Sequence, residues 1–331
     1  MNRAIQYRKF GGPEVLEMVE TADPAPAEDE VRLAVRAVGL NPLEEKVFGG
    51  DARLRLAERV HRLFHPTDWF GKGPRLPRGV ARDFAGIVDS VGGNVTDFAV
   101  GDAVLGTLRG APTLGSKQGS LVEKLVISVD DVVSKPDSLS FEVASSLGVA
   151  AQTASGALRQ IDLNSTDVIV ISAASGGVGT LAVQLAVHRG ATVIGIAGER
   201  NVDYLRSLGA IPVTHGEGVQ SRVLAAAPKP VTKLLDCYGG EYVKLGFALG
   251  LHGRGIGTLV PSPSAIIKGA QFTGSRHAEP GDLQEVADLV ADGTINVSIA
   301  HVYSFNVESV RDAYTELHKG HVRGKLVVNV A

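Results

Sequence analysis

The stretch that decides the fold reads ISAASGGVGTLAVQLA, from Ile171 to Ala186. A hydrophobic run of strand length meets a glycine cluster here, and the cluster opens into a second hydrophobic segment. Gly177, Gly179 and Ala182 fit the pattern G-x-G-x-x-A, after a predicted strand and at the start of a predicted helix. In a dinucleotide-binding turn the first glycine permits the tight turn, the second admits a pyrophosphate, and the small third residue lets helix and strand pack closely. The alternative interpretation is a plain tight turn in an α/β protein.

Strand-length apolar runs recur on both sides of this turn and alternate with amphipathic segments that close near a glycine. The predicted strands cover residues 167–173, 191–197, 210–214, 232–237, 254–260 and 270–275. The predicted helices cover residues 178–190, 201–209 and 241–253, after an earlier helix at 140–160 with Ser140 as its cap. This alternation predicts right-handed crossovers and a parallel sheet covered on both faces.

The first 135 residues have a different pattern. Their apolar runs are short and end at turns, and within them apolar and polar residues alternate with a period of two. Residues 31–40, VRLAVRAVGL, are the clearest example of a half-buried strand. Residues 51–70 interrupt this β region with helical spacing, which predicts a short helix in a long loop. The elements after residue 276 are too few for a domain, so we expect them to return to the first region.

Composition narrows the class of protein. The chain has 331 residues, 44% of them hydrophobic, which suggests two domains. The net charge is −3 with scattered basic residues, so we expect no nucleic-acid partner. Cys237 is the only cysteine, which excludes a disulfide within the chain and a cysteine-based zinc cluster. No apolar run reaches the ~18 residues of a membrane span, and residues 1–10 lack the apolar core of a signal peptide. We predict a soluble, cytoplasmic protein with no membrane partner.

The end of the strand after the glycine turn bears on the choice of dinucleotide. An NAD-binding protein usually places a carboxylate there, against the ribose 2′-hydroxyl. Here the tip is Ala197-Gly198, followed by Glu199 and Arg200. Arg200 can pair with a 2′-phosphate through two hydrogen bonds, which favours NADPH. Glu199 argues for NADH unless it turns to solvent, and both side chains can also be ordinary solvated loop charges.

Several stretches, in this order along the chain, resemble the medium-chain dehydrogenases/reductases. They are YRKFGGPEVLE at 7–17, AVGLNPLEEKVFGG at 37–50, RDFAGIVDSVGGNVTDFAVGDAVLG at 82–106, AASGGVG at 173–179 and the closing GHVRGKLVVNV at 320–330. Within that superfamily the chain is most similar to the zinc-independent quinone oxidoreductases, the zeta-crystallin-like group, over nearly its whole length.

The resemblance implies an α/β fold in which a Rossmann domain is inserted into a GroES-like β-barrel catalytic domain. The predicted catalytic domain covers residues 1–137 and 276–331, and the predicted NADP(H)-binding domain covers residues 138–275. The resemblance also implies a small-molecule substrate and a homodimer formed through the last Rossmann strand, at about 267–275.

The resemblance further bears on metal. Zinc-dependent relatives use a cysteine, a Gly-His-Glu segment and a further cysteine for the catalytic metal, and a four-cysteine lobe. The segment here that matches Gly-His-Glu reads Ala81-Arg82-Asp83, and the lobe is absent. His61 and His65 have ligand-compatible spacing on a predicted helix, but no third ligand accompanies them. We therefore predict no metal and interpret both histidines as polar positions of an amphipathic helix.

Cofactor contacts carry over from the family to matching positions of this chain. We expect the cofactor to contact Thr153, Ser175, Gly176, Gly177, Val178, Gly198, Arg200, His215, Leu259, Val260, Ser275, Arg276 and Lys325. His215 matches a strand-end position beside the adenosine phosphate in NADPH-using relatives, and it can also be an exposed loop histidine. Lys325 belongs to the closing Gly-Lys pair of the family.

The residues expected at the reacting end are Asn41 and Lys46, in LNPLEEK. A hydride acceptor needs a hydrogen-bond donor for the charge that develops on its oxygen. Lys46 can donate to an enolate oxygen or supply a proton, or it can be a solvated surface lysine. Quinone reductases often carry tyrosine at that position. With lysine there, this chain resembles instead the relatives that reduce the C=C bond of enones or enoyl thioesters. Asn41 is expected to position the nicotinamide ribose or the substrate, and Asp83 to make structural hydrogen bonds.

The loop of residues 51–80 is longer than the family leads us to expect, and long irregular loops are often functional. With His65, Trp69 and Phe70 it can cover the substrate pocket and select a flat, bulky substrate, or it can be a dimer contact or a packed surface loop. The sequence as a whole predicts an NADPH-dependent, zinc-free reductase of quinones or activated C=C bonds. The alternatives are a metal-free alcohol dehydrogenase or carbonyl reductase, and a non-catalytic NADPH-binding protein.

Overall fold

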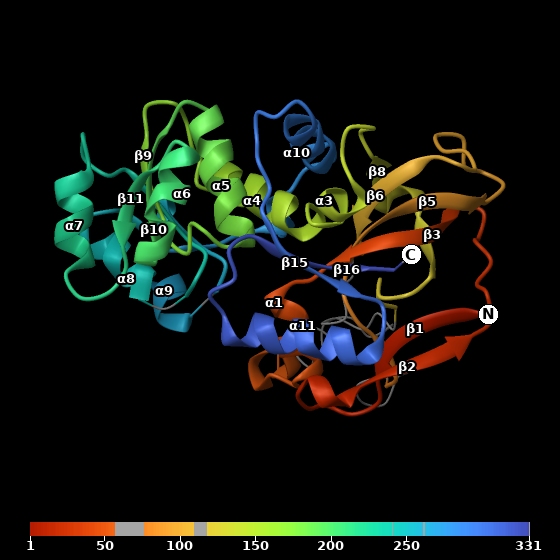
Figure 1. Ribbon diagram of the computed structural model, residues 1–331. Helices are drawn as coiled ribbons and strands as arrows, with labels where there is room; N and C mark the ends of the chain where they lie inside the picture. The colour runs from red at the N-terminus through yellow and green to blue at the C-terminus, as the bar shows by residue number, and fades with distance from the viewer. Residues whose placement is uncertain (57–75, 109–117, 240, 261, 331) are drawn as a thin grey trace. The chain divides into compact units, whose positions relative to one another are not determined.

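The computed structural model describes residues 1–56, 76–108, 118–239, 241–260 and 262–330. The chain divides into two compact units (Figure 1). Unit 1 joins Met1–Val149 to Ile299–Ala331, and unit 2 consists of Ala150–Ser298. Most of the predicted helix at 51–70 and of the loop at 51–80 lies outside the described residues. Within the described part of that segment, residues 52–56 are helical.

Unit 2 is built on a six-stranded parallel sheet. The strands in chain order are β9 (Val168–Ile171), β10 (Thr192–Ala197), β11 (Ile211–Thr214), β12 (Lys233–Asp236), β13 (Ile256–Thr258) and β14 (Gln271–Phe272). Their order across the sheet is β11-β10-β9-β12-β13-β14, which is the 3-2-1-4-5-6 order of a Rossmann fold. All four residues of β9 are buried, as expected for a central strand between two helical layers. The six strands predicted from the apolar runs are confirmed, and each is shorter than its run, most of all β13 and β14.

Helices α5 (Gly177–His188), α6 (Val202–Ser207), α7 (Val219–Ala226), α8 (Glu241–Ala248) and α9 (Pro263–Ile267) connect the strands of unit 2. Helix α4 (Gly148–Gln160) precedes the first strand, and α10 (Asp282–Ala291) follows the last. Helices α7 and α9 were not predicted, because each is short and carries few apolar residues in helical register. The predicted helix at 140–160 is two helices, α3 (Phe141–Ser145) and α4, and Ser140 does cap the first by accepting a hydrogen bond from the Val143 N–H at 3.2 Å.

The unit boundaries lie later than the predicted domain boundaries. We placed them at 137/138 and 275/276, and the units divide at 149/150 and 298/299. Helix α3 packs on β3 and β5 and so belongs to unit 1. Helix α10, which we expected to return to the first region, stays in unit 2 because Arg159 of α4 donates to both Asp282 carboxylate oxygens, at 2.5 and 2.9 Å. A half-buried ion pair of this kind is not visible as a periodic pattern in the sequence.

Unit 1 is a β structure of two sheets. The three-stranded sheet has the order β2 (Leu16–Thr21), β1 (Asn2–Tyr7), β4 (Arg78–Gly79). The seven-stranded sheet has the order β15 (Ile299–Ser304), β16 (Lys325–Asn329), β3 (Glu30–Gly39), β5 (Asp83–Val91), β6 (Ala103–Thr107), β8 (Val132–Ser134), and β7 (Lys124–Ser128) also pairs with β3. Strand β16 pairs antiparallel with β3, with Val328 opposite Val38, so strands from residues 30–39 and 325–329 are neighbours in this sheet.

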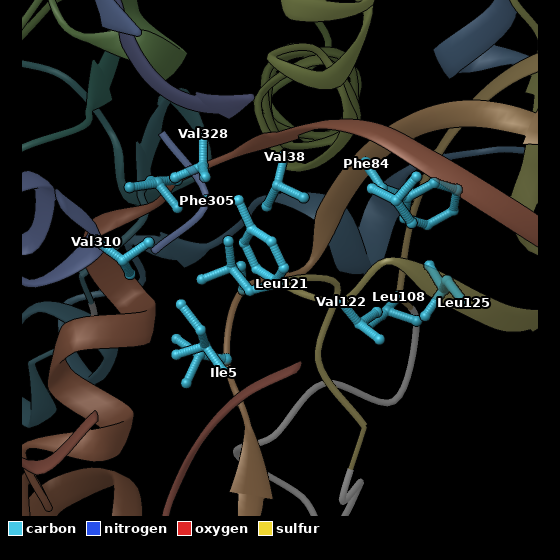
Figure 2. Close-up of a cluster of buried hydrophobic side chains, with 14 of the residues drawn as sticks. Ile5, Val38, Phe84, Leu108, Leu121, Val122, Leu125, Phe305, Val310 and Val328 are labelled. Atoms are coloured by element: carbon cyan, nitrogen blue, oxygen red, sulfur yellow. The ribbon is translucent and has the colours of Figure 1, made fainter. Parts of the chain in front are cut away.

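The core of unit 1 is an apolar cluster drawn from both ends of the chain (Figure 2). Ile5, Val38, Phe84, Phe305 and Val328 contribute to it, and all are buried. Helix α11 (Val307–Lys319) covers it with Val310 and Tyr314 and contacts α1 (Pro42–Phe48). Helix α1 was not predicted, although Asn41 caps it, Pro42 opens it and Glu44 closes the capping box.

Candidate functional site

The turn after β9 has the geometry that anion binding requires. Ala173 adopts a left-handed backbone with φ 47°, and the Gly176 N–H closes the turn on the Ala173 carbonyl at 3.0 Å. Helix α5 begins at Gly177, with Gly176 as its N-cap residue and no side-chain cap. The N–H groups of the first helical turn have no acceptor within a helix, so Gly177, Val178 and Gly179 present donors at the positive end of α5.

Close packing of α5 against the turn requires a glycine at position 179, independently of any ligand. A Cβ built on Gly179 would lie 2.2 Å from the Ala173 carbonyl oxygen and 2.8 Å from the Ala174 Cα. Helix α5 therefore meets the turn so closely that any side chain at this position displaces backbone. The sequence interpretation gave this role to Ala182, which is also fully buried, and placed the tight turn at Gly177, whereas the structure places it at Ala173.

The carboxyl ends of β10 and β11 lie beside this turn. Asn201 donates a hydrogen bond from Nδ2 to Ser175 Oγ at 3.0 Å, which ties the glycine turn to the end of β10. The His215 N–H donates to the Ala197 carbonyl at 3.1 Å, and its Nε2 lies 3.7 Å from the position a Cβ on Gly198 would take. Arg200 and His215 are both exposed. The structure thus groups the predicted residues of this side at two adjacent strand ends.

The remaining predicted cofactor residues of unit 2 converge on the other side of the turn. Leu259 and Val260 follow β13, and Ser275 and Arg276 follow β14. A Cβ on Gly274 would lie 3.5 Å from both Leu259 Cδ2 and Thr153 Cγ2, so both side chains lie next to Gly274. Every predicted cofactor residue of unit 2 except Thr153, on α4, therefore follows the carboxyl end of a strand, the edge of a parallel sheet at which ligands bind.

The charges and hydrogen-bond donors of unit 2 fit a dinucleotide. The first turn of α5 contains no acidic side chain, so nothing on that turn repels a phosphate. The residues that fit a pyrophosphate are the backbone donors of Gly177 to Gly179, and those that fit a phosphorylated ribose are Arg200 and His215. The site suits a dinucleotide, whose pyrophosphate the glycine turn can bind.

Unit 1 contains a buried polar cluster, which we define as Asn41, Glu44, Asp83, Tyr314 and Lys325. All five side chains are buried. They come from five places in the fold: the N-cap and the first turn of α1, the start of β5, the middle of α11 and the start of β16.

Asp83 and Lys325 hold the charges at the centre of this cluster. Lys325 Nζ lies 3.3 Å from Asp83 Oδ2 and donates to Asn41 Oδ1 at 2.7 Å. Asp83 Oδ1 accepts from the Val149 N–H, the second residue of α4, at 2.8 Å. A Cβ on Gly148 would lie 2.4 Å from the same oxygen, so the glycine lets α4 begin against this carboxylate.

The amide of Asn41 is held in one orientation. Its Nδ2 donates to Glu44 Oε1 and to Asp83 Oδ2, both at 3.0 Å, and its Oδ1 accepts from Lys325. The reverse orientation would set its carbonyl against two carboxylates and its NH₂ group against an ammonium. An amide has two N–H bonds, and both of those of Asn41 are used within the cluster. Asn41 therefore cannot donate a further hydrogen bond to a ligand.

Glu44 titrates unusually within this cluster. Burial raises the pKa of Glu44 to about 7, against the opposing effect of donors from Asn41 and from the Tyr314 hydroxyl. The pKa of Tyr314 is raised well above its ordinary value, first by burial and then by the neighbouring Glu44 carboxylate. The cluster thus contains one carboxyl that changes charge near neutral pH.

Comparison with known proteins places this geometry in a family. Residues 27–137 match the alcohol dehydrogenase GroES-like domain, and residues 208–328 match the zinc-binding dehydrogenase family. The chain is 31% identical to a quinone oxidoreductase of Pseudomonas aeruginosa, over 99% of both chains. It is 30% identical to the chloroplast envelope quinone oxidoreductase homolog of Arabidopsis thaliana, over 98% of this chain and 97% of that one.

The chain belongs to the medium-chain dehydrogenase/reductase superfamily. Its fold matches the solved quinone oxidoreductase of Coxiella burnetii with a TM-score of 0.82 and 30% identity, over 100% of this chain and 99% of that one. The predicted GroES-like and Rossmann architecture is therefore confirmed.

Two predictions about this medium-chain dehydrogenase/reductase concern residues outside the cluster. Lys46 lies exposed in the last turn of α1, and its predicted donor role stays a prediction. His61, His65, Trp69 and Phe70 lie outside the described residues. Among the described residues, no three His, Cys, Asp or Glu side chains are grouped to hold a metal ion, and no helix has the length and hydropathy needed to cross a membrane.

The sequence analysis missed two members of the cluster, Glu44 and Tyr314. Glu44 carried a signal, because Asn41-Pro42-Leu43-Glu44 is a capping-box sequence with proline at the first helical position. Tyr314 carried none, because it stands in an ordinary amphipathic helix and only the packing of α11 on α1 brings its hydroxyl to Glu44, at 2.8 Å.

Proposed function

We propose that this chain is an NADPH-dependent, zinc-free oxidoreductase that reduces quinones or activated C=C bonds by hydride transfer. The observation that carries the proposal is the glycine turn at Ala173–Gly179, with exposed Arg200 and His215 at the two neighbouring strand ends. The relatives named above, which are quinone oxidoreductases, support the choice of acceptor.

The preference for NADPH rests on charge at the end of β10. Arg200 is exposed there, and the hydrogen bond from His215 N–H to Ala197 brings the start of the next loop to the same place. A guanidinium pairs with a phosphate through two parallel hydrogen bonds, a geometry that a 2′-hydroxyl cannot use. Glu199 is also exposed, and we propose that it turns to solvent.

The proposal of zinc-free chemistry rests on what Arg82 and Asp83 do in the fold. Asp83 is fully buried and engaged by the Val149 N–H, Asn41 and Lys325. Arg82 donates to the Leu108 carbonyl at 2.8 Å. These are the residues that stand where zinc-dependent relatives have His-Glu, and each is committed to protein groups.

Bound NADPH would supply the hydride, and the residues of this chain would orient the reaction around it. The backbone donors of Gly177 to Gly179 would hold the pyrophosphate. Asn41, held in one orientation by Lys325, Asp83 and Glu44, would help to position the nicotinamide ribose or the substrate. Lys325 has a third N–H beyond those given to Asn41 and Asp83, and Lys46 is exposed. We propose these two lysines as the donors for charge that develops on the acceptor oxygen.

A set of acceptors tests the proposal. We expect NADPH consumption with an ortho-quinone or a simple enone that a chelator does not slow, and little with an aldehyde or with NADH. Turnover with the aldehyde would favour a metal-free carbonyl reductase or alcohol dehydrogenase. NADPH binding without turnover of any acceptor would favour a non-catalytic binding protein. Analytical ultracentrifugation and cell fractionation test the predicted homodimer and cytoplasmic location.

A further inference from the structure

The loop that follows β12 carries an exposed aromatic side chain, Tyr238. Its exposed fraction is 73%. Tyr238 and Tyr242, which is in the first turn of α8, form an edge-to-face pair with ring centroids 6.0 Å apart. The two rings are therefore mutually ordered while one of them remains open to solvent.

The backbone under Tyr238 is fixed by a buried carboxylate. Asp236 Oδ1 accepts from the N–H groups of Tyr238 and Gly239, at 3.0 and 2.8 Å. Its Oδ2 accepts from Thr258 Oγ1 on β13 at 2.9 Å, and Asp236 is fully buried. The backbone that carries the exposed ring is thus fixed at the strand end. Less conformational entropy is therefore lost when a ligand binds against the ring.

One residue, Ser172, links this loop to the start of the glycine turn. Ser172, the residue after β9, donates from Oγ to Asp236 Oδ1 at 2.8 Å, and the same Oγ accepts from the Cys237 N–H at 2.9 Å. The next residue, Ala173, opens the glycine turn. Tyr238 therefore lies at the point where the strand order reverses between β9 and β12, which is where sheets of this type bind their ligands.

The position also determines which end of the dinucleotide faces Tyr238. The glycine turn follows β9, and the proposed 2′-phosphate residues follow β10 and β11, on one side of it. A dinucleotide spans the crevice with one nucleotide on each half of the sheet. The adenosine half is thus assigned to the β10 side, and the nicotinamide half to the side of β12, where Tyr238 stands.

We propose that Tyr238 is a specificity-determining residue that stacks against a flat acceptor of two or more fused rings, with Tyr242 holding its ring from the edge. The inference rests on the proposed function and narrows the acceptor class to polycyclic quinones in preference to small aliphatic enones. Tyr238 takes no part in hydride or proton transfer. It contributes ring-to-ring contact, which depends on the area of the acceptor.

The experiment compares Tyr238→Leu and Tyr238→Phe with wild type. Leucine keeps an apolar side chain and removes the ring, and phenylalanine keeps the ring and removes the hydroxyl. We expect Tyr238→Leu to raise KM about 5- to 10-fold for 9,10-phenanthrenequinone and less than twofold for 2-cyclohexenone, with kcat retained. Tyr238→Phe should behave like wild type. Leu224→Ala, which changes an exposed side chain on α7, is the matched control and should change neither value.

Binding provides a second readout that does not need turnover. Calorimetry should give the same Kd for NADPH in wild type and Tyr238→Leu, and weaker binding of the redox-inert ring naphthalene-2-sulfonate to the variant. Equal KM values for the polycyclic quinone would overturn the inference, as would a matching loss for the enone. A weakened NADPH Kd would reassign Tyr238 to the cofactor. If wild type reduces no acceptor, the proposed function fails, and the ring titration still decides whether Tyr238 binds flat rings.

Discussion

The buried carboxyl of Glu44 predicts a specific pH dependence of stability in unit 1. Glu44 is 4% exposed, and burial raises its pKa from an ordinary 4.5 to about 7. The nearby Asp83 charge raises it further, and donors from Asn41 and Tyr314 lower it. The folded state therefore binds a proton at this group that the unfolded state has already released at neutral pH. Stability from this proton is fully present below pH ~4.5 and is lost as the pH rises through ~7.

The size of the effect follows from the two pKa values. With 7 in the folded state and 4.5 in the unfolded state, the free energy of unfolding should fall by about 1.4 kcal/mol between pH ~6 and pH ~8.5 through Glu44 alone. Substitution of Glu44→Gln removes this titration. The absolute stability of the variant should also fall, because its NH₂ group meets one of the donors that now bond the carboxylate.

The measurement is the difference in pH slope between wild type and Glu44→Gln. Urea unfolding followed by hydrogen exchange on peptides that cover β5 reports unit 1 by itself. The exposed Glu20→Gln on β2 is the surface control and should keep the wild-type slope. Infrared difference spectra should show a protonated-carboxyl band near neutral pH that disappears in Glu44→Gln. Parallel slopes for wild type and Glu44→Gln, with no such band, would refute the reasoning.

Three further substitutions test other parts of the structure. Gly179→Ala should lower the free energy of unfolding by about 1–3 kcal/mol and weaken NADPH binding, because its Cβ would meet the Ala173 carbonyl at 2.2 Å; unchanged urea midpoint and Kd would contradict this packing. Lys325→Met should cost about 3–5 kcal/mol at neutral pH, since Asp83 loses its buried cation; a cost below about 1 kcal/mol would show that this pair does not hold the cluster together. Arg200→Glu should weaken NADPH binding at least about 10-fold and leave NADH binding nearly unchanged; equal weakening in calorimetry would remove the 2′-phosphate role.

Much of unit 2 could be predicted from the sequence because its information is local. Each strand of a parallel sheet covered on both faces is a short apolar run, and each crossover helix repeats its apolar residues with helical spacing. The glycine pattern predicts the turn from only seven consecutive residues, 173–179. The strand positions and the binding turn were therefore visible before the sheet order was known. The reason for Gly179 was not visible, because it depends on how closely α5 meets the Ala173 carbonyl.

The sequence by itself determined the fold class of this protein, the dinucleotide turn and most strands of unit 2, since apolar period and glycine spacing act over a few residues. Tertiary structure alone decided the unit boundaries and the buried polar cluster. Asn41 and Lys325 are 284 positions apart in the sequence. They are in contact because β16 pairs antiparallel with β3, so that Lys325, the first residue of β16, lies next to Asn41, the N-cap of α1. Sheet register fixes such a contact, and no local pattern encodes register between strands so distant in the chain.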